Sequence, residues 1–547
     1  MQAKHVLWII LLLALVVRLP ALGHLVYGDE YRFVPGAMPT NHVGLIDNFE
    51  MPPLPTWMNQ LFAVFIPDAT LATRLASLLF GMLNIWLVYL IGKRLYNEKA
   101  GLWAAALFAF SVYAVWASVA VELNGVNMLF AFLLAMYAMI SLDKTKDKKW
   151  LYVFGIAGGI GMLSRYECFL FYPLLLLDQW YYHKDWKLAI KRCIIAGLIT
   201  TAIFAIFPII SYATGSNHFY STIERGANMT MKTVQDFHIV PYLVQLLYAL
   251  LWLGLPFGAL LLIGLKKYEK AHFRWYVWAV LLILFYTLFV NDNFSPFDRY
   301  FTLLMPAFLF IGLSKVIVKK PKGWWQSFAF FSILMLVMVV GANQTQEQLP
   351  FYPKEAYVSR ALSLDWQFLI PFNGGSGPIG FLASFSSIAL AFLVALLCIV
   401  AYWVLPHKET TLALLLATGL VLNVYLIEEF AYGTTHPNIN QVTKHAIEYV
   451  KETTPTDEHL YFFRNWALKL YLQEYEKTNL DFFNDTATNA RHLQSEFKKG
   501  GTIMWVDFPP INKKGPLWKV VNSCKKDTSF YSKGVETAMV FRCSPSP

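Results

Sequence analysis

Two adjacent carboxylates, Asp29 and Glu30, follow the first apolar segment of the chain in the stretch Gly28-Asp29-Glu30-Tyr31-Arg32. Ionisable groups at or near membrane depth usually mark a site or a pathway, because each unpaired charge there is costly. Neighbouring side chains point in different directions, so one carboxylate can accept a proton while the other binds a substrate. The residues alone leave a second interpretation open, in which Asp29 caps a short helix and Glu30 is solvated.

The composition decides which class of protein must position this pair. Hydrophobic residues make up 57% of the 547 residues, charged residues make up 15%, and the mean hydropathy is +0.45. Soluble domains carry about 25% charged residues, so a soluble single-core protein is excluded. The chain is predicted to be an α-helical polytopic membrane protein.

A span across about 30 Å of hydrocarbon needs about 20 apolar residues. We count thirteen candidate segments, of which the fifth and sixth meet at Ser164-Arg165-Tyr166-Glu167 and could instead form one interrupted span. The segments lie near 5–24, 73–92, 101–119, 123–142, 150–164, 166–182, 192–213, 241–265, 274–291, 300–318, 324–341, 378–405 and 410–429.

The loop charges choose between these two topologies. With thirteen spans, the short loops rich in Lys and Arg all fall on one side of the membrane, and the positive-inside rule makes that side cytoplasmic. The N-terminus is then inside and the C-terminus outside, with the first segment kept as an uncleaved anchor. The net charge of +10 is spread over these loops, so it does not indicate nucleic-acid binding.

This topology divides the chain into two expected domains. Residues 1–431 form the membrane domain, and residues 432–547 form a small extracytoplasmic α/β domain. Cys524 and Cys543 flank the last expected strand in this oxidising exterior, which predicts a disulfide between them. The membrane domain is expected to have outer loops near 25–70, 214–240 and 342–377. The C-terminal domain is expected to form helices at 440–452 and 466–475 and strands at 459–463, 502–508 and 537–542.

Several motifs accompany the carboxylate pair. They are Asp29-Glu30-Tyr31-Arg32-Phe33, Met51-Pro52-Pro53-Leu54 with Trp57, Arg74 with Ala76, Ser77 and Gly81, Gly92-Lys93-Arg94-Leu95, and the stretches 163–167 and 298–306. In these residues the chain resembles the GT-C glycosyltransferases, close to the aminoarabinose-lipid A transferases and the protein O-mannosyltransferases. Thirteen spans followed by an outer C-terminal domain also match the aminoarabinose branch.

The resemblance implies transfer of a sugar from a polyprenyl-phosphate donor to a hydroxyl of a lipid, glycan or protein. The reaction would occur on the extracytoplasmic face and invert the anomeric configuration. Asp29 is then the expected general base and Glu30 the residue that binds or orients the acceptor. The implied ligands of the donor phosphate are Arg165, Arg299 and Arg74. The implied substrate contacts are Arg32, Glu50, Trp57, Glu167 and Tyr300. Pro52 and Pro53 are expected to form a structural turn.

Other interpretations of these residues stay open. Arg165 can pair with Glu167, Arg299 can pair with Asp298, Arg74 can reach lipid headgroups, and Trp57 serves equally well as an interfacial anchor. Met51 stands where relatives often have Lys or His, so a phosphate contact by that side chain is not expected here. Some relatives use a divalent cation and others do not, which leaves the metal requirement open.

Other functional classes fit these residues less well than glycosyl transfer. A transporter or flippase of a lipid-linked sugar would have broken helices with ionisable residues near the membrane midplane, whereas the charges here gather at outer segment ends. A structural or sensory protein would not need thirteen spans. An oligosaccharyltransferase is less favoured because the tail has no Trp-Trp-Asp-Tyr-Gly motif.

Overall fold

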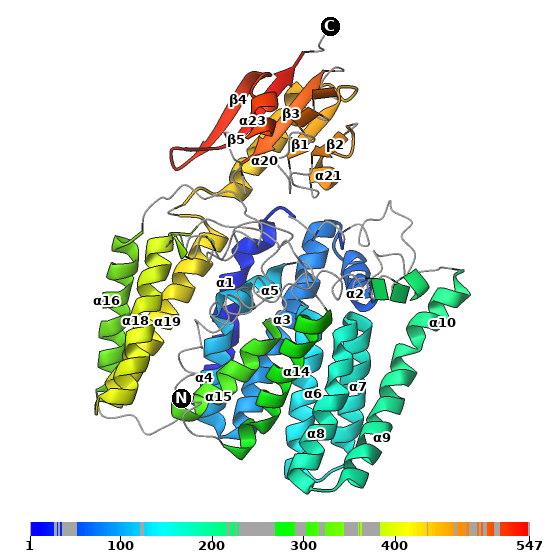
Figure 1. The fold of residues 1–547 in the computed structure, drawn as a ribbon, viewed down its shortest axis with the longest axis vertical. Helices are drawn as coiled ribbons and strands as arrows, with labels where there is room; N and C mark the ends of the chain where they lie inside the picture. Colours follow the sequence, from blue (N-terminus) through cyan, green and yellow to red (C-terminus); the bar gives the residue numbers. More distant parts are fainter. Residues whose placement is uncertain are drawn as a thin grey trace. The chain divides into compact units, whose positions relative to one another are not determined.

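The computed structural model contains mainly helices, together with one five-stranded sheet (Figure 1). The chain forms two compact units, one made of residues 1–22, 32–342 and 387–425 and the other of residues 23–31, 343–386 and 426–547. The structure describes residues 2–26, 30, 33–34, 52–120, 125–215, 219–221, 223–224, 227–228, 269–289, 302–316, 323–343, 359, 362–363, 383–434, 436–463, 468–475, 477–480, 490–491, 494–495, 500–507, 513 and 515–544.

Helices occupy twelve of the thirteen expected segments, and the remaining one, 241–265, lies outside the described residues. Among the described residues, seven helical segments are long and apolar enough to cross a membrane, or eight if one bent pair counts as a span. The chain is thus a multi-pass membrane protein, and the number thirteen stays a prediction. The helices are α1 (Ala3–Arg18), η1 (Leu19–Gly23), α2 (Leu54–Ala63), α3 (Ala69–Leu95), α4 (Glu98–Ala109), α5 (Val112–Val119), α6 (Val126–Thr145), α7 (Lys149–Ser164), η4 (Tyr166–Leu170), α8 (Phe171–His183), α9 (Trp186–Phe204), α10 (Ile206–Ala213), η5 (Lys270–His272), α14 (Phe273–Phe289), α15 (Met305–Val316), α16 (Trp324–Gly341), α18 (Phe385–Val404) and α19 (Lys408–Ala431).

Small residues let the helices of the first unit approach closely. A Cβ added at Gly81 of α3 would lie 2.3 Å from the Ser118 hydroxyl, and one added at Gly155 of α7 would lie 2.8 Å from Ile199 of α9. The Thr200 hydroxyl donates to the Gly155 carbonyl at 2.7 Å. Such close contacts are a main source of helix association in membranes, where lipid is as apolar as the side chains.

The expected span at 101–119 is not a straight helix, because α4 and α5 meet at an angle of 66°. A break leaves backbone groups without helical partners, and in a membrane the protein itself must satisfy them. The Arg18 guanidinium donates to the carbonyl of Ala109, the last residue of α4, at 3.0 Å. The first residue of α5, Val112, donates its N–H to the Asn423 side chain at 2.9 Å.

The sheet of the second unit has the strand order β2-β1-β3-β5-β4. Strands β1 (Leu460–Phe463), β2 (Lys477–Leu480) and β3 (Gly501–Val506) are parallel, whereas β4 (Lys525–Ser532) and β5 (Val535–Cys543) pair antiparallel. Every residue of β3 is buried, so both faces of this strand are covered. The helices of this unit are α20 (Ile439–Thr453), α21 (Leu468–Tyr471) and α23 (Pro516–Val521).

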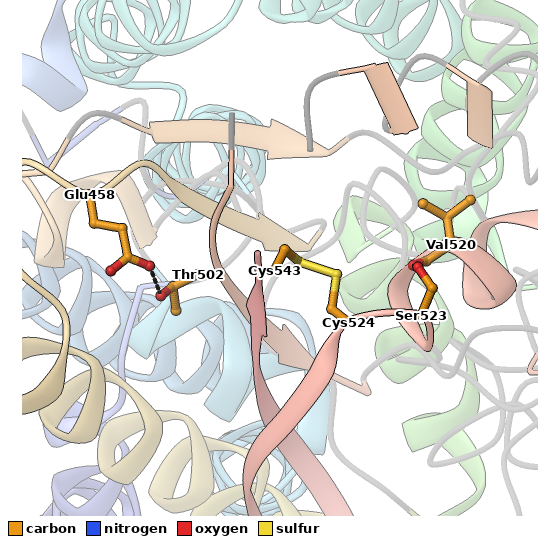
Figure 2. The surroundings of a disulfide bond; sticks show 6 residues. All are labelled: Glu458, Thr502, Val520, Ser523, Cys524 and Cys543. Carbon is orange, nitrogen blue, oxygen red and sulfur yellow. Dashed lines mark hydrogen bonds between the residues drawn. A yellow bond between two sulfur atoms is a disulfide. The ribbon is translucent and has the colours of Figure 1, made fainter. Parts of the chain in front are cut away.

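Helix α23 packs on one face of the sheet, where Leu517 and Val521 join Ile503, Trp505 and Met539 in one buried cluster. Figure 2 shows the disulfide between Cys524, just before β4, and Cys543 at the end of β5, the pairing expected from the sequence. The strands β2 and β4 and the helix α23 were not predicted. The expected strands at 459–463, 502–508 and 537–542 and the helix at 440–452 agree with β1, β3, β5 and α20 to within a few residues. The helix expected at 466–475 was wrong in length, because α21 ends at Tyr471 and residues 472–475 are not helical.

Candidate functional site

The end of α7 brings several of the expected site residues together. Helix α7 stops at Ser164, and Arg165 takes an extended backbone, with φ −157° and ψ 142°, before the short helix η4 begins. This turn places Arg165 Nη1 3.8 Å from Glu167 Oε1, with 15% and 16% of the two side chains exposed. The Tyr286 hydroxyl of α14 donates to the same carboxylate oxygen at 3.4 Å.

The Arg165 side chain also lies against the start of α6. A Cβ added at Gly125 would come within 3.3 Å of Arg165 Nε, and Gly125 has a φ of +63°, which disfavours any residue with a side chain. Helix α6 begins at the next residue, so its positive end lies beside the guanidinium. Arg165 and this helix end together make a local environment suited to an anion.

The proline turn is built onto the same end of α7. Pro52 and Pro53 are buried and precede α2, with Pro53 as its N-cap residue. Trp57 of α2 is half-buried and packs on the cluster formed by Leu163 and Phe207. Leu163 is two residues before Arg165, so Trp57 and Arg165 are held by the same helix end.

An apolar pocket of about 270 Å³ opens between α7, η4, α8 and α9. One of its walls, Phe204, packs edge-on against Tyr166, the residue between Arg165 and Glu167. The pocket therefore begins next to the Arg165–Glu167 pair. It is lined by Met162, Phe169, Tyr172, Gly197, Thr200, Thr201 and Phe204.

Arg74 has a different setting from the one expected. It is fully buried, and its guanidinium donates to the carbonyl of Val119, the last residue of α5, at 2.6 Å. This bond satisfies a carbonyl at the C-terminal end of α5, the end away from the break between α4 and α5. The contact is neither with a headgroup nor at an exposed phosphate site, and a donor-phosphate role for Arg74 stays a prediction without support from this geometry.

Of the carboxylate pair, Glu30 is described and is completely buried in the second unit. Asp29 lies outside the described residues, as do Arg32, Glu50, Met51, Arg299 and Tyr300. Their expected roles stay predictions. Within the described part of the chain, no group of three or more His, Cys, Asp or Glu residues could hold a metal ion.

Sequence reasoning missed a second ionic cluster of the first unit. Arg274 at the start of α14 lies between two acidic residues, with Nη2 2.7 Å from Asp143 Oδ2 and Nε 3.2 Å from Asp178 Oδ1. The Gln179 amide donates to Asp178 Oδ2 at 3.0 Å. Asp178 inside an apolar run was the available signal, because a carboxylate at such a position needs a buried partner.

This second cluster lies far from Arg165. Asp143 is near the end of α6 and Gly125 directly precedes that helix, and 18 residues of helix extend for about 27 Å. The two clusters therefore occupy opposite ends of the same helix.

The comparisons with known proteins agree with the predicted resemblance. The family model of dolichyl-phosphate-mannose-protein mannosyltransferases matches residues 50–212, which include the proline turn, Trp57, Arg165 and Glu167. No curated protein sequence matches the chain. The matched range contains every described residue that the structure places around the end of α7, except Tyr286.

Among solved structures, ArnT from Cupriavidus metallidurans bound to undecaprenyl phosphate is similar, with 15% identity, a TM-score of 0.58, and coverage of 100% of this chain and 99% of that one. The apo structure of the same enzyme gives 15% identity, a TM-score of 0.57 and coverage of 99% and 98%. An oligosaccharyltransferase from Archaeoglobus fulgidus tethered with an acceptor peptide is more distant, with 12% identity, a TM-score of 0.45, and coverage of 98% of this chain and 74% of that one. The ArnT matches show the GT-C fold, and with the family match they confirm the resemblance to ArnT-like and mannosyltransferase-like proteins.

Proposed function

We propose that this chain, with its GT-C fold, is an integral-membrane glycosyltransferase that takes a sugar from a polyprenyl-phosphate donor. The acceptor is a hydroxyl of a lipid, glycan or protein on the extracytoplasmic face. The Lys- and Arg-rich loops support this orientation, with the N-terminus in the cytoplasm and the C-terminus outside. Within the described residues, no observation favours the transporter alternative.

One observation carries the proposal. The family match over 50–212 covers residues that are far apart in sequence, and the structure gathers them at one end of α7. The proline turn and Trp57 lie about a hundred positions before Arg165 and Glu167. A set of matched residues that assembles around a single turn is what a shared binding site requires.

The donor is assigned to this turn because its chemistry fits. A guanidinium offers a planar fork of N–H groups that bonds two phosphate oxygens, and the start of α6 adds partial positive charge. The adjoining pocket is apolar and about 270 Å³ in volume, which suits the first part of an isoprenoid chain. A lipid-linked phosphate would thus place its charge at Arg165 and its tail against Phe169, Tyr172 and Phe204.

The proposed reaction is a single displacement at the anomeric carbon. The acceptor oxygen forms a bond to this carbon as its proton passes to the Asp29 carboxylate, while the bond to the phosphate oxygen breaks and the phosphate leaves with the electron pair. Attack opposite to the leaving group inverts the configuration. Glu30 orients the acceptor, and Arg165 with Arg299 stabilises the departing phosphate.

The experiment is sugar transfer by purified protein in nanodiscs, tested with a panel of polyprenyl-phosphate sugars and hydroxyl acceptors. Replacement of a general base lowers the rate by about 10²–10⁴-fold, so we expect a loss of this size in kcat for Asp29→Asn. Asp68→Asn is the matched control, because Asp68 caps α3 by accepting from the Leu71 N–H at 2.9 Å and Asn caps equally well. Full activity of Asp29→Asn would refute its assignment as the base.

A further inference from the structure

The backbone just before the carboxylate pair is bonded to distant parts of the second unit. The Leu25 N–H donates to Asn440 Oδ1 at 2.6 Å, and the Val26 N–H donates to the Tyr471 hydroxyl oxygen at 2.8 Å. These partners lie 415 and 445 positions further along the chain. Two consecutive backbone N–H groups therefore donate to side chains from the C-terminal part of the second unit, residues 426–547.

Two more contacts reach the same segment. The Lys444 ammonium donates to the Gly23 carbonyl at 2.7 Å. The imidazole of His24 is buried, with Nε2 3.2 Å from the Ala431 carbonyl. Each residue from 23 to 26 thus has a bond to a residue beyond 430, all within the second unit.

The groups that hold the segment are carried by regular structure. Asn440 and Lys444 are four residues apart on α20, which places them on the same face of that helix. Helix α20 packs on β3, β4 and β5, and Tyr471 is the last residue of α21. Side chains supported in this way hold a partner more accurately than side chains on loops.

These bonds are needed because residues 24–26 are buried outside any helix or strand. Leu25 is 7% exposed and Val26 is 0% exposed, and buried N–H groups without a partner are rare in folded proteins. Glu30, four residues after Val26, is also fully buried in this unit. Residues 24–26 therefore depend on the C-terminal part of the second unit for their position.

We propose that α20 and α21 position Glu30 for the reaction, with Asn440, Lys444 and Tyr471 as positioning residues that act through the backbone of residues 23–26. This proposal rests on the proposed function. A shift of about 1 Å in a reacting group can lower a rate by about 100-fold. Residues that do not touch the reacting atoms can thereby control the rate of the chemical step.

The first test follows the backbone directly, by hydrogen exchange and mass spectrometry of full-length protein in nanodiscs. Tyr471→Phe removes the acceptor for Val26, and we expect exchange of the peptide covering residues 23–31 to become about 10-fold faster, because one hydrogen bond is lost. Tyr475→Phe is the control, since the Tyr475 hydroxyl donates to the Thr454 carbonyl within the same unit at 3.2 Å. Equal exchange in wild type and Tyr471→Phe would overturn the proposal.

The second test asks whether the held backbone matters for the reaction. Asn440→Leu loses the oxygen that accepts from Leu25, whereas Asn440→Asp keeps an acceptor of the same size. We expect kcat to fall about 10-fold in Asn440→Leu and about 100-fold in Asn440→Leu/Tyr471→Phe, with the donor KM unchanged. We expect Asn440→Asp to restore kcat, which a loss of folded protein would not predict.

The outcomes separate this proposal from the proposed function. If wild type transfers sugar and all the variants keep its kcat, the positioning role is wrong and the glycosyltransferase function stands. If wild type transfers nothing from any donor, the proposed function fails and the positioning role fails with it. The exchange experiment then still reports whether the C-terminal part of the second unit holds residues 23–26.

Discussion

The two ends of the helix group α6, α8 and α14 carry ionic clusters of opposite character. At one end Arg274 is 4% exposed, lies 2.7 Å from Asp143, and has a second buried carboxylate at 3.2 Å. At the other end Arg165 and Glu167 are 3.8 Å apart and about one-sixth exposed. A buried network with short ionic distances is typical of a structural connection between helices. An ion pair that is further apart and partly exposed can exchange its partner for a substrate.

The comparison explains why burial alone does not identify a functional arginine. Arg18, Arg74 and Arg274 are all buried, and each bonds to a helix-end carbonyl or a carboxylate of the same fold. Arg165 is the one at the proline turn, beside Gly125 and the apolar pocket. These contacts indicate a structural role for the first three arginines, and substrate binding by Arg165 is part of the proposed function.

The largest expected effect is that of Arg274→Met on stability. Removing one partner of a buried ion pair costs about 3–5 kcal/mol, because Asp143 and Asp178 would remain without their cation. We expect a lower thermal midpoint and less folded protein, with kcat and KM unchanged for the folded fraction. Lys149→Met is the control, since its pair with Asp147 is exposed and exposed pairs contribute little to stability. An unaltered midpoint in Arg274→Met would contradict the structural role.

Arg165→Met should give the opposite result. A hydrogen bond to a charged group contributes about 1.5–3 kcal/mol, so the donor KM should rise by about 10- to 100-fold in steady-state kinetics, while the thermal midpoint changes little. The exposed Lys93, paired with Glu98 at 2.9 Å, provides Lys93→Met as a control cation. A large loss of stability with an unchanged KM would place Arg165 in the same class as Arg274.

The smallest effect is expected for Tyr286→Phe. It removes the hydroxyl that donates to Glu167 at 3.4 Å and leaves the ring in its buried position. The loss of about 0.5–1.5 kcal/mol for one hydrogen bond corresponds to a change of up to about tenfold in kcat/KM. A matched change in kcat/KM in Glu167→Gln, with no further loss in the double variant, would show that Tyr286 acts through Glu167.

Much of this fold was predictable because apolar length decides where spans lie. The 27 residues of α3 and the 24 of α19 were expected from the sequence to within a few residues. The bend between α4 and α5 was not predicted, because Phe110 and Ser111 are compatible with a continuous helix. The break is stabilised by Arg18 and Asn423, which are distant in sequence. Strand β4 was missed because Lys525–Ser532 is polar and depends on its pairing with β5.

The candidate site was predicted less completely than the fold. Motif resemblance identified Trp57, Arg165 and Glu167, which do meet at the end of α7. No spacing could connect Arg274 with Asp143, 131 positions away, because such a contact depends on how helices pack. The sequence also left two settings open for Arg74, and the structure gives a third, the carbonyl of Val119.

The stereochemistry of transfer is the sharpest test of the proposed displacement at the anomeric carbon. Wild-type protein in nanodiscs is supplied with a polyprenyl-phosphate sugar of known anomeric configuration and with a hydroxyl acceptor, and the product is examined by NMR. We expect a glycoside of inverted configuration, formed by wild type and by Lys149→Met, and a rate of formation lower by about 10²–10⁴-fold in Asp29→Asn. A glycoside of retained configuration, or no product from any donor in the panel, would contradict the proposed displacement.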